Sequence, residues 1–143
     1  MDMLDWVKQH YSCDTTRVYV LGMSLGGYGT MDVCGTYPDR IAAGMALCGG
    51  CSLKDGSGFG ESILDYPWYS RQSCPVKQSK VVVDKLKRDG NDTRLIYDWW
   101  QGANHGMPAR VFYMKKTYQW LFSHTLNDPD RPVNRDIDIS MGD

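Results

Sequence analysis

The amino-acid sequence predicts an α/β fold in which helices flank a parallel sheet. Segments rich in strand-forming residues alternate along the chain with segments of helical periodicity, and strands joined by helices run parallel within one sheet. Residues 41–48 form an apolar run with several small side chains, which is typical of a strand buried on both faces. The chain has 143 residues, of which 42% are hydrophobic, so it suits one domain with a real core and excludes wholesale disorder.

Apolar spacing and turn residues predict the elements of the first half of the chain. Residues 2–11 form a helix, because their apolar side chains recur with a rough helical period. Residues 17–21 are rich in strand formers and end at a glycine, so they form a strand. Residues 25–36 form a helix that ends before Pro38, because the residue before a proline is disfavoured in a helix.

The same reasoning predicts the elements of the second half. Residues 49–62 are rich in Gly and Ser and are expected to form a loop. Residues 76–88 form a helix with Gly90 as its C-terminal stop. Residues 93–99 are a strand candidate, and residues 101–108 form a loop.

A final helix and a polar tail are predicted to close the chain. The buried stripe of this helix is expected at positions spaced three, four and three residues apart, namely Val111, Met114, Tyr118 and Leu121. The domain is then expected to cover residues 1–126. Residues 127–143 are polar and contain two prolines, so they are expected to form a tail or a linker.

The overall charge and hydropathy exclude several classes of protein. The chain carries 16 Lys and Arg against 17 Asp and Glu, so its net charge of −1 leaves no basic footprint for nucleic acid. No apolar run approaches the roughly 18 residues that a transmembrane helix needs. The first residues are acidic and periodic, which is unlike a signal peptide, so the targeting segment of a secreted or periplasmic parent protein would lie outside this chain.

The five cysteines are an odd number, so at least one thiol stays unpaired within the chain. Cys48 and Cys51 have the spacing of a redox motif, but they follow an apolar strand-like run rather than the context of a thioredoxin site. No second close pair of cysteines completes a zinc site. We therefore expect small apolar residues or an incidental disulfide, and these two possibilities stay open.

A serine motif lies directly between a predicted strand and a predicted helix. Residues 22–26 read Gly-Met-Ser-Leu-Gly, and in this context Gly-x-Ser-x-Gly is typical of a strained turn that exposes a nucleophilic serine. Side chains at Gly22 and Gly26 are expected to collide with the neighbouring strand and helix. Ser24 is therefore the candidate nucleophile, and the N–H of Leu25 at the helix N-terminus is placed to bind an oxyanion.

Two other interpretations of this motif need no nucleophile. The first is a tight glycine-rich turn without chemistry. The second is a phosphate-binding loop, which requires Lys followed by Ser or Thr after the glycines. Tyr28 and Gly29 stand at that place instead, so the phosphate loop is excluded.

His105 is the candidate general base among the three histidines. It lies in a loop of small residues between a predicted strand and the final helix, and loops that follow parallel strands meet at the carboxyl edge of the sheet, where Ser24 also lies. The alternative is a structural loop histidine. His10 and His124 are expected at the surface, His124 as a cation near a helix end.

Aromatic side chains surround the predicted histidine loop. Their flat walls suit a sugar or a phenolic acyl group. We expect Met23, Tyr28 and Trp100 to contact the substrate. The alternative for other aromatic residues, Trp99 and Phe112, is that they belong to the core.

Taken together, these motifs resemble those of the α/β-hydrolase superfamily. More narrowly, they are similar to those of bacterial enzymes like polyhydroxybutyrate depolymerases, feruloyl esterases and acetylxylan esterases. The likeness covers most of residues 1–126 and is carried by Gly22-Met-Ser-Leu-Gly-Gly-Tyr-Gly-Thr30, Tyr37-Pro-Asp-Arg40, Leu47-Cys-Gly-Gly50, Pro75-Val-Lys-Gln-Ser79, Gly102-Ala-Asn-His105 and Tyr118-Gln-Trp-Leu-Phe122. It implies a serine hydrolase of carboxylic esters, including carbohydrate or phenolic esters, with Ser24 as nucleophile, Leu25 N–H as oxyanion donor and His105 as base. It implies no cofactor and no metal. Prolyl-oligopeptidase-type peptidases share the same catalytic half, so a peptidase remains an alternative.

The chain departs from the family pattern at its start. The family has several strands before the serine strand, and a loop after an early strand supplies the second oxyanion donor. Here only one predicted helix precedes the serine strand. We therefore expect a partial α/β-hydrolase fold without its N-terminal strands, either as a fragment or with an open sheet edge through which it associates with another chain.

The second departure concerns the acid of the catalytic triad. The family places this acid after a strand in the region of residues 64–74, but this stretch shows no strand character, and Arg71 stands near the expected acid. A reading frame shifted by one base could encode the family pattern Trp-Ile-Ile-His-Gly-Thr-Ala-Asp here, so two compensating frame errors are a hypothesis. Otherwise the candidate acids are Asp55, Asp65 and Asp98, or the chain is a catalytically incomplete remnant.

Overall fold

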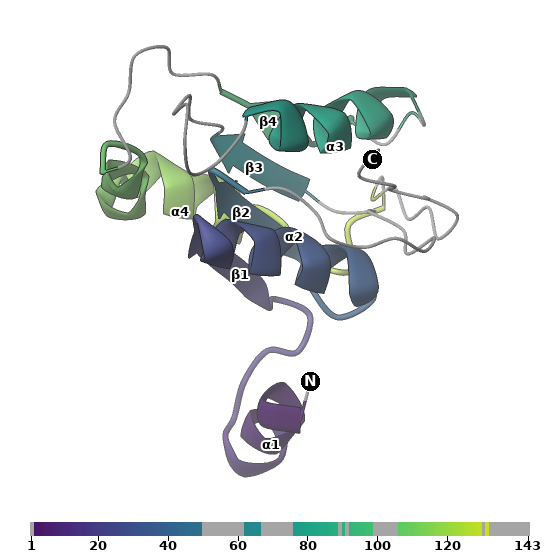
Figure 1. Cartoon of the computed structure of the whole chain (residues 1–143). Coiled ribbons are helices and arrows are strands. Elements are labelled where there is room, and N and C mark those ends of the chain that lie inside the picture. Colours follow the sequence, from purple (N-terminus) through teal and green to yellow (C-terminus); the bar gives the residue numbers. More distant parts are fainter. Residues whose placement is uncertain are drawn as a thin grey trace.

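The computed structural model describes residues 2–49, 62–66, 76–88, 90, 92–98, 106–129 and 131 (Figure 1). The helices are α1 (Asp2–His10), α2 (Leu25–Thr36), α3 (Val76–Arg88) and α4 (Lys115–Phe122), with a 3₁₀ helix η1 (Pro108–Tyr113) before α4. The strands are β1 (Tyr19–Met23), β2 (Ala43–Leu47), β3 (Ser62–Tyr66) and β4 (Ile96–Tyr97).

The four strands form one parallel sheet whose spatial order is the same as their order along the chain. Tyr19 pairs with Ala43 and Ala43 with Ser62, and Leu64 pairs with Ile96. Because all four strands run in the same direction, their carboxyl ends share one edge of the sheet. This arrangement confirms the predicted parallel sheet with flanking helices.

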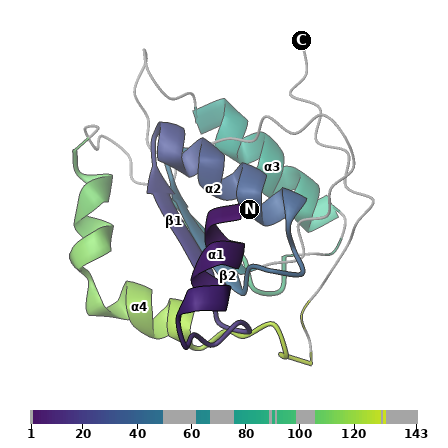
Figure 2. The same cartoon turned by 90° about the horizontal axis from the view of Figure 1, so that it is seen from below.

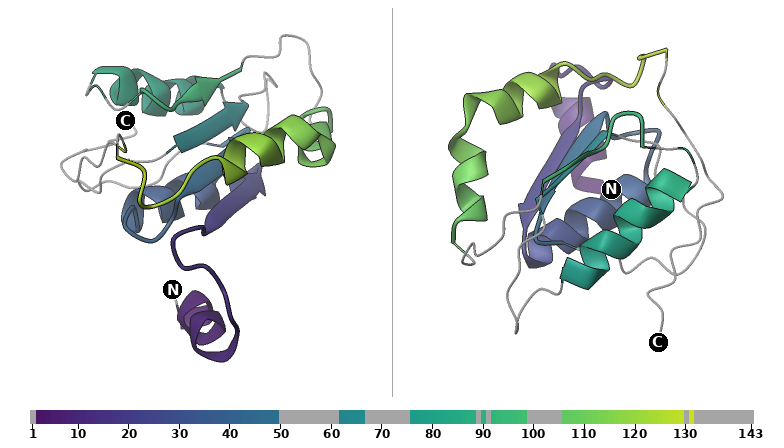
Figure 3. Two further views of the ribbon diagram at one scale, coloured as in Figure 1. Left: turned by 180° about the vertical axis from the view of Figure 1, so that it is seen from behind. Right: turned by 90° about the horizontal axis from the view of Figure 1, so that it is seen from above.

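The helices cover the two faces of the sheet unequally. Helices α2 and α3 lie side by side on one face, and α4 lies on the other (Figures 2 and 3). Helix α1 lies apart from these layers, beyond the amino end of β1 (Figure 1). β1 forms one edge of the described sheet, so association through this edge stays a prediction.

The core is built around β2, which is buried along its whole length. Met45 and Leu47 form a buried cluster with Val111 of η1. Since successive strand residues face opposite sides of a sheet, Gly44 faces α2. A Cβ atom at Gly44 would lie 2.6 Å from Sγ of Cys34, which shows how closely α2 approaches the sheet.

Several elements predicted from the sequence are confirmed, with shifted ends. The helices expected over 2–11, 25–36 and 76–88 correspond to α1, α2 and α3. The strand expected over 17–21 begins two residues later, the strand over 41–48 is shortened to β2, and the strand over 93–99 is reduced to β4.

The expectation that residues 64–74 lack strand character is wrong for their first part. β3 covers Ser62–Tyr66 and pairs with β2 over its full length, from Ala43 with Ser62 to Leu47 with Tyr66. The buried neighbour offers a complete row of backbone partners, and this tertiary pairing outweighs a weak local strand pattern. Residues 67–74 lie outside the described residues.

The prediction of a single final helix is also wrong, because the helix is interrupted at Met114. This residue is extended, with φ −88° and ψ 123°, and it separates η1 from α4. The Thr117 hydroxyl donates to the Val111 carbonyl at 2.9 Å and the Tyr118 hydroxyl to the Phe112 carbonyl at 2.7 Å, so side chains of α4 are hydrogen-bonded to backbone carbonyls of η1 across the break. Val111 and Leu121 of the predicted stripe are fully buried, but Met114 is 41% exposed.

The first residues of the predicted tail remain attached to the domain. Asp128 accepts a hydrogen bond from Arg94 at 2.7 Å, and Arg131 donates to the Ile41 carbonyl at 2.8 Å. A domain end at residue 126 therefore stays a prediction. No helix within the described ranges is long and apolar enough to cross a membrane.

Candidate active site

Ser24 occupies the turn between the end of β1 and the start of α2. Its backbone has φ 59° and ψ −119°, which is a costly conformation for a residue with a side chain. Its N–H donates to the Leu47 carbonyl at 2.8 Å, and its carbonyl accepts from the Tyr28 N–H at 3.1 Å. The strained turn is thus held by the neighbouring strand on one side and by the first turn of α2 on the other.

The two glycines of the motif differ in what surrounds them. A Cβ atom at Gly22 would overlap the Gly26 carbonyl and would lie 2.7 Å from Oγ1 of Thr30, so the expected collision at Gly22 is confirmed. The same expectation is wrong for Gly26, where a Cβ atom would meet nothing within 4 Å among the described residues. Gly26 lies on an exposed side of α2, which no neighbouring element approaches in the described part of the structure.

The tightly packed glycine of α2 is Gly27, which the sequence argument missed. A Cβ atom at Gly27 would lie 2.6 Å from the Leu47 carbonyl oxygen and 2.9 Å from Cα of Gly49. The repeated glycine at positions 26 and 27 was the available signal. The motif alone does not say which of the two glycines touches the sheet.

The helix N-terminus next to Ser24 offers backbone donors. Leu25 begins α2, and the first N–H groups of a helix have no acceptor within it. The Ser24 side chain makes no capping hydrogen bond to them within the described part of the chain. Leu25 is 85% exposed.

The residues expected to contact substrate lie in different surroundings. Met23 ends β1 and packs against the cluster of Met45, Leu47 and Val111. Tyr28 is half-buried in the first turn of α2. Trp100 and Trp99 lie outside the described residues, whereas Phe112 packs against the core cluster, which confirms the core alternative for that residue.

His105 also lies outside the described residues. The segment that carries it leaves β4 after Tyr97, at the carboxyl edge of the sheet. Ser24 follows β1 at the same edge, because the strands are parallel. The topology therefore agrees with the sequence argument that brought the two segments to one edge, and the role of His105 stays a prediction.

The other two histidines lie away from Ser24. His10 is exposed on α1, as expected, and its ring stacks on Trp6 with centroids 4.2 Å apart. The expectation of a surface residue is wrong for His124, whose side chain is only 15% exposed. Its carbonyl accepts from the Tyr19 hydroxyl at 2.9 Å, so His124 lies at the amino end of β1, opposite to Ser24.

Burial sets the electrostatics of His124. Loss of water lowers the pKa of its imidazole, the charge of Arg94 acts in the same direction, and Asp128 opposes both. Nδ1 of His124 lies 3.6 Å from the Asp128 carboxylate, which also accepts from Arg94. His124, Asp128 and Arg94 thus form a cluster that joins the segment after α4 to the segment before β4.

The candidate acids are placed only in part. Asp98 is exposed just after β4, at the carboxyl edge of the sheet. Asp65 lies within β3, and Asp55 lies outside the described residues. The identity of the acid therefore stays a prediction.

Three of the five cysteines fall in the described part of the chain. Cys34 and Cys48 are buried, as expected for small apolar residues, whereas Cys13 is exposed. Cys51 and Cys74 lie outside it. Within the described ranges no group of three or more His, Cys, Asp or Glu side chains is arranged to hold a metal ion.

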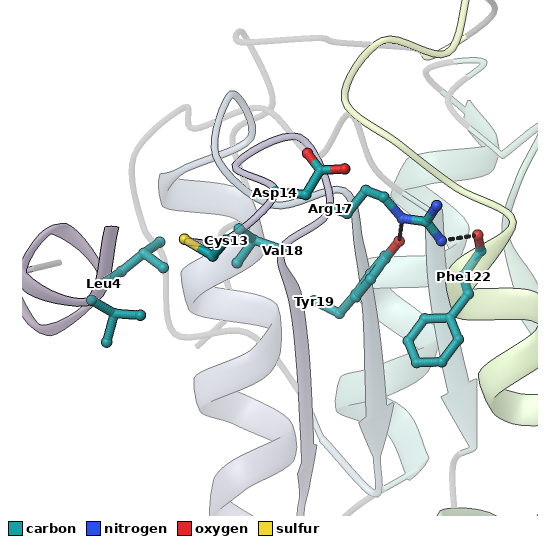
Figure 4. A pocket seen from close by; sticks show the side chains of 8 residues that line it. Leu4, Cys13, Asp14, Arg17, Val18, Tyr19 and Phe122 are labelled. Atoms are coloured by element: carbon teal, nitrogen blue, oxygen red, sulfur yellow. Dashed lines mark hydrogen bonds between the residues drawn. The ribbon is translucent and has the colours of Figure 1, made fainter. Parts of the chain in front are cut away.

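A pocket of about 430 Å³ lies between α1, the segment that follows it and the end of α4 (Figure 4). Its walls are mostly apolar, and they are formed by Leu4, Val7, Cys13, Asp14, Arg17, Val18, Tyr19 and Phe122. Arg17 crosses one side, donating to the Tyr19 hydroxyl at 3.2 Å and to the Phe122 carbonyl at 2.8 Å. The pocket lies at the amino end of β1, so it is distinct from the site at Ser24.

The fold and the serine turn together define a class of protein. A serine held at positive φ, between a parallel strand and the helix that follows it, has the position and the backbone geometry that are typical of the nucleophile elbow in α/β hydrolases. The strand order, with β1 and β4 at opposite ends of one parallel sheet, is that of a partial fold of this class.

Comparisons with known proteins agree with this class. No family model matches the chain. The chain is 27% identical over 145 residues to acetylxylan esterase A of Emericella nidulans, and the matched region covers 93% of this chain and 45% of that protein. It is 27% identical over 128 residues to feruloyl esterase B of Neurospora crassa, covering 82% of this chain and 41% of that protein. A crystal structure of a thermostable esterase matches with a TM-score of 0.74 and 25% identity, covering 87% of this chain and 35% of the other.

The resemblance stated from the motifs is thereby confirmed: the chain is related to carboxylic ester hydrolases with an α/β-hydrolase-like fold. It spans less than half the length of these relatives.

Proposed function

We propose that this chain acts as a serine hydrolase of carboxylic esters with Ser24 as its nucleophile. The observation that carries the proposal is the backbone of Ser24, at φ 59° and ψ −119° between β1 and α2. Such strain persists only where the surrounding structure enforces it, and it clusters at functional sites. The names of the relatives, which are esterases, support the hydrolysis of carboxylic esters.

In the proposed reaction, Oγ of Ser24 attacks the acyl carbonyl carbon while His105 takes the hydroxyl proton. The N–H of Leu25 donates to the oxyanion that forms on the carbonyl oxygen. The tetrahedral intermediate collapses, His105 returns the proton to the leaving alcohol, and an acyl-enzyme remains. Water then attacks this ester, with His105 again as base, and releases the acid and the free serine.

His105 is proposed as the base because the other histidines lie elsewhere. His10 is exposed on α1 and His124 is enclosed at the amino end of β1. The loop of His105 starts from the carboxyl edge of the sheet, which is also the edge of Ser24. Sequence order, serine before histidine, supports the same assignment.

For the substrate we propose esters of carbohydrates or of phenolic acids. This class follows from the aromatic residues near the histidine loop, and two relatives are named acetylxylan esterase and feruloyl esterase. Met23, Tyr28 and Trp100 are the residues proposed to contact it. No cofactor and no metal enters the proposed mechanism.

The expected turnover rate depends on whether an acidic residue orients His105. Loss of the orienting acid costs about 10⁴ in turnover in a serine protease. Without Asp65, Asp98 or Asp55 in this role, the chain would turn over slowly, but Ser24 would still react with activated acyl groups. Activated esters are therefore the appropriate first substrates.

The test is hydrolysis of p-nitrophenyl acetate by the full chain. We expect Ser24→Ala and His105→Ala to remove the activity above background, and the matched variant Ser123→Ala, at an exposed serine after α4, to keep it. Faster cleavage of a proline-linked amide than of the ester would point to a peptidase instead. Activity that is equal in wild type and Ser24→Ala would overturn the proposal, and a folded wild type without activity would indicate a catalytically incomplete remnant.

A further inference from the structure

The segment that follows β2 lies directly against the turn of Ser24. We name Leu47, Cys48 and Gly49 the β2 bracket. The Leu47 carbonyl accepts the Ser24 N–H at 2.8 Å, which extends the β1–β2 pairing into the turn. Cys48 is buried with φ 54°, one of the few non-glycine residues at positive φ in the described chain. The bracket is therefore itself a strained turn that faces the strained serine.

Gly49 and Gly27 form the contact between the bracket and α2. A Cβ atom at Gly27 would lie 2.9 Å from Cα of Gly49, and a Cβ atom at Gly49 would lie 2.7 Å from the Gly27 carbonyl oxygen. Both distances are shorter than the contacts that Cβ atoms make in proteins. The first turn of α2 thus rests on the bracket, with no space for a single methyl group between them.

A third element holds the bracket from the other side. The Ser79 hydroxyl, on α3, donates a hydrogen bond to the Gly49 carbonyl. Ser79 is 1% exposed, so this bond is shielded from water. A buried carbonyl that lost its donor would cost stability, and the chain would move to find another partner.

We propose that the β2 bracket, Gly27 and Ser79 are positioning residues for Ser24, an inference that rests on the proposed function. The contact of Gly27 with Gly49 and the bond from Ser24 to Leu47 fix the first turn of α2 relative to the sheet. This turn carries both the nucleophile and the Leu25 N–H. A displacement of about 1 Å between reacting groups can cost about 10²-fold in rate, so the bracket sets the reactivity of the serine without touching the substrate.

The test compares Gly27→Ala, Gly49→Ala and Ser79→Ala with two control variants. Gly44→Ala introduces an overlap in the same α2–β2 layer, with side chains rather than backbone, 2.6 Å from Sγ of Cys34 and 3.3 Å from Cγ2 of Thr30, and its nearest neighbours do not include the β2 bracket. Gly29→Ala adds a methyl group on α2 where no described residue lies within 4 Å of it. Each full-length variant is reacted with a fluorophosphonate, and the saturating rate and half-saturation constant are measured per folded molecule. Amide hydrogen exchange at Ser24 is measured in parallel.

We expect a saturating rate about 10²-fold lower in Gly27→Ala and Gly49→Ala, with a half-saturation constant within about twofold of wild type. Ser79→Ala, which creates no overlap, is expected to lower the rate by about threefold to tenfold, which corresponds to losing one hydrogen bond. Exchange at the Ser24 amide should accelerate in the same variants. Both controls should match wild type in rate and in exchange, even where Gly44→Ala lowers the melting temperature.

Equal rate losses in Gly44→Ala and Gly27→Ala would overturn the inference, because general destabilisation would then explain both. Unchanged exchange and rate in Gly27→Ala and Gly49→Ala would also overturn it. If folded wild type does not react at all, the proposed function fails, and the exchange at Ser24 still decides the inference. Faster exchange in the bracket variants alone would support it, and equal exchange in all variants would reject it.

Discussion

Gly22 of β1 and Thr30 of α2 lie so close that a Cβ atom at Gly22 would come within 2.7 Å of the Thr30 hydroxyl oxygen. Thr30 is buried, and its hydroxyl donates to the Gly26 carbonyl at 2.8 Å. The same Cβ atom would lie 2.1 Å from the Gly26 carbonyl oxygen, so the strand before the serine and the helix after it are in direct backbone contact. This contact makes the turn at Ser24 sharp.

Replacement of Gly22 by alanine is expected to lower the free energy of unfolding by about 1–3 kcal/mol or more, because the new methyl group overlaps backbone that cannot move freely. Gly29→Ala is the control on α2, where the added methyl group meets none of the described residues within 4 Å. It should raise the free energy of unfolding by about 0.5–1 kcal/mol, because alanine favours a helix over glycine. Urea denaturation measures both values, and a shift in the same direction for the two variants would contradict the packing described for Gly22.

Replacement of Ser24 tests the strain at the turn. Ser24→Gly and Ser24→Ala both remove the hydroxyl, but only glycine adopts φ 59° without steric cost. The greater entropy of glycine in the unfolded chain offsets part of this advantage. We therefore expect Ser24→Gly to be more stable than Ser24→Ala by about 1 kcal/mol. A more stable alanine variant in urea denaturation would show that the turn relaxes in solution.

Two ion pairs of different burial are expected to differ in their contribution to stability. Asp128 and Arg94 are 21% and 14% exposed, and the Asp128 carboxylate also accepts from the Thr125 hydroxyl at 2.9 Å. Asp128→Ala should lower the free energy of unfolding by about 1–3 kcal/mol, because it leaves enclosed donors without an acceptor.

The matched control is Asp84→Ala on α3. Asp84 pairs with Lys80, and their side chains are 48% and 54% exposed. An exposed pair of this kind contributes about 0.5 kcal/mol or less. Equal losses for the two variants in thermal unfolding would refute the distinction drawn from burial.

Stability is expected to fall as the pH is lowered below about 6.5, and His124 is expected to contribute to this fall. Burial lowers the pKa of His124 in the folded state, so the folded chain binds fewer protons at this site than the unfolded chain. The contribution of His124 to stability is complete above the pKa that its imidazole has in the unfolded chain. It is lost as the pH falls from that value towards the lower pKa of the folded state.

His124→Gln should therefore make the dependence of unfolding free energy on pH shallower between pH 7.5 and 5.5, a window of about two pH units around the ordinary pKa of histidine. Burial tends to raise the pKa of Asp128, but hydrogen bonds from Thr125 and the charge of Arg94 outweigh it and lower the pKa. The contribution of Asp128 is thus lost only at more acidic pH and does not enter this window. An unchanged slope in His124→Gln would contradict the burial of the imidazole.

The elements that were predicted correctly are those encoded by local pattern. The serine turn follows from a strand ending at a glycine and a helix beginning directly after it, and the apolar run of β2 identifies a buried strand. β3 was missed because its strand character comes from pairing with β2 rather than from its own residues. The break at Met114 was missed because a helical period can be counted through an interruption that side-chain hydrogen bonds stabilise.

In the candidate site, too, the residues set by local sequence pattern were predicted, and those set by tertiary contacts were not. Ser24 and Gly22 were identified from five residues of sequence. Gly27, Gly49 and Ser79 come from three separate segments, and their contact depends on how α2 and α3 lie on the sheet. Spacing along the chain carries no signal for such contacts.

Mass spectrometry of the full chain after reaction with a fluorophosphonate shows whether Ser24 is the nucleophile. We expect a single covalent adduct on the peptide that contains Ser24, its disappearance in Ser24→Ala, and its retention in Ser123→Ala. An adduct on another serine, or a folded chain that carries no adduct at all, would contradict this assignment.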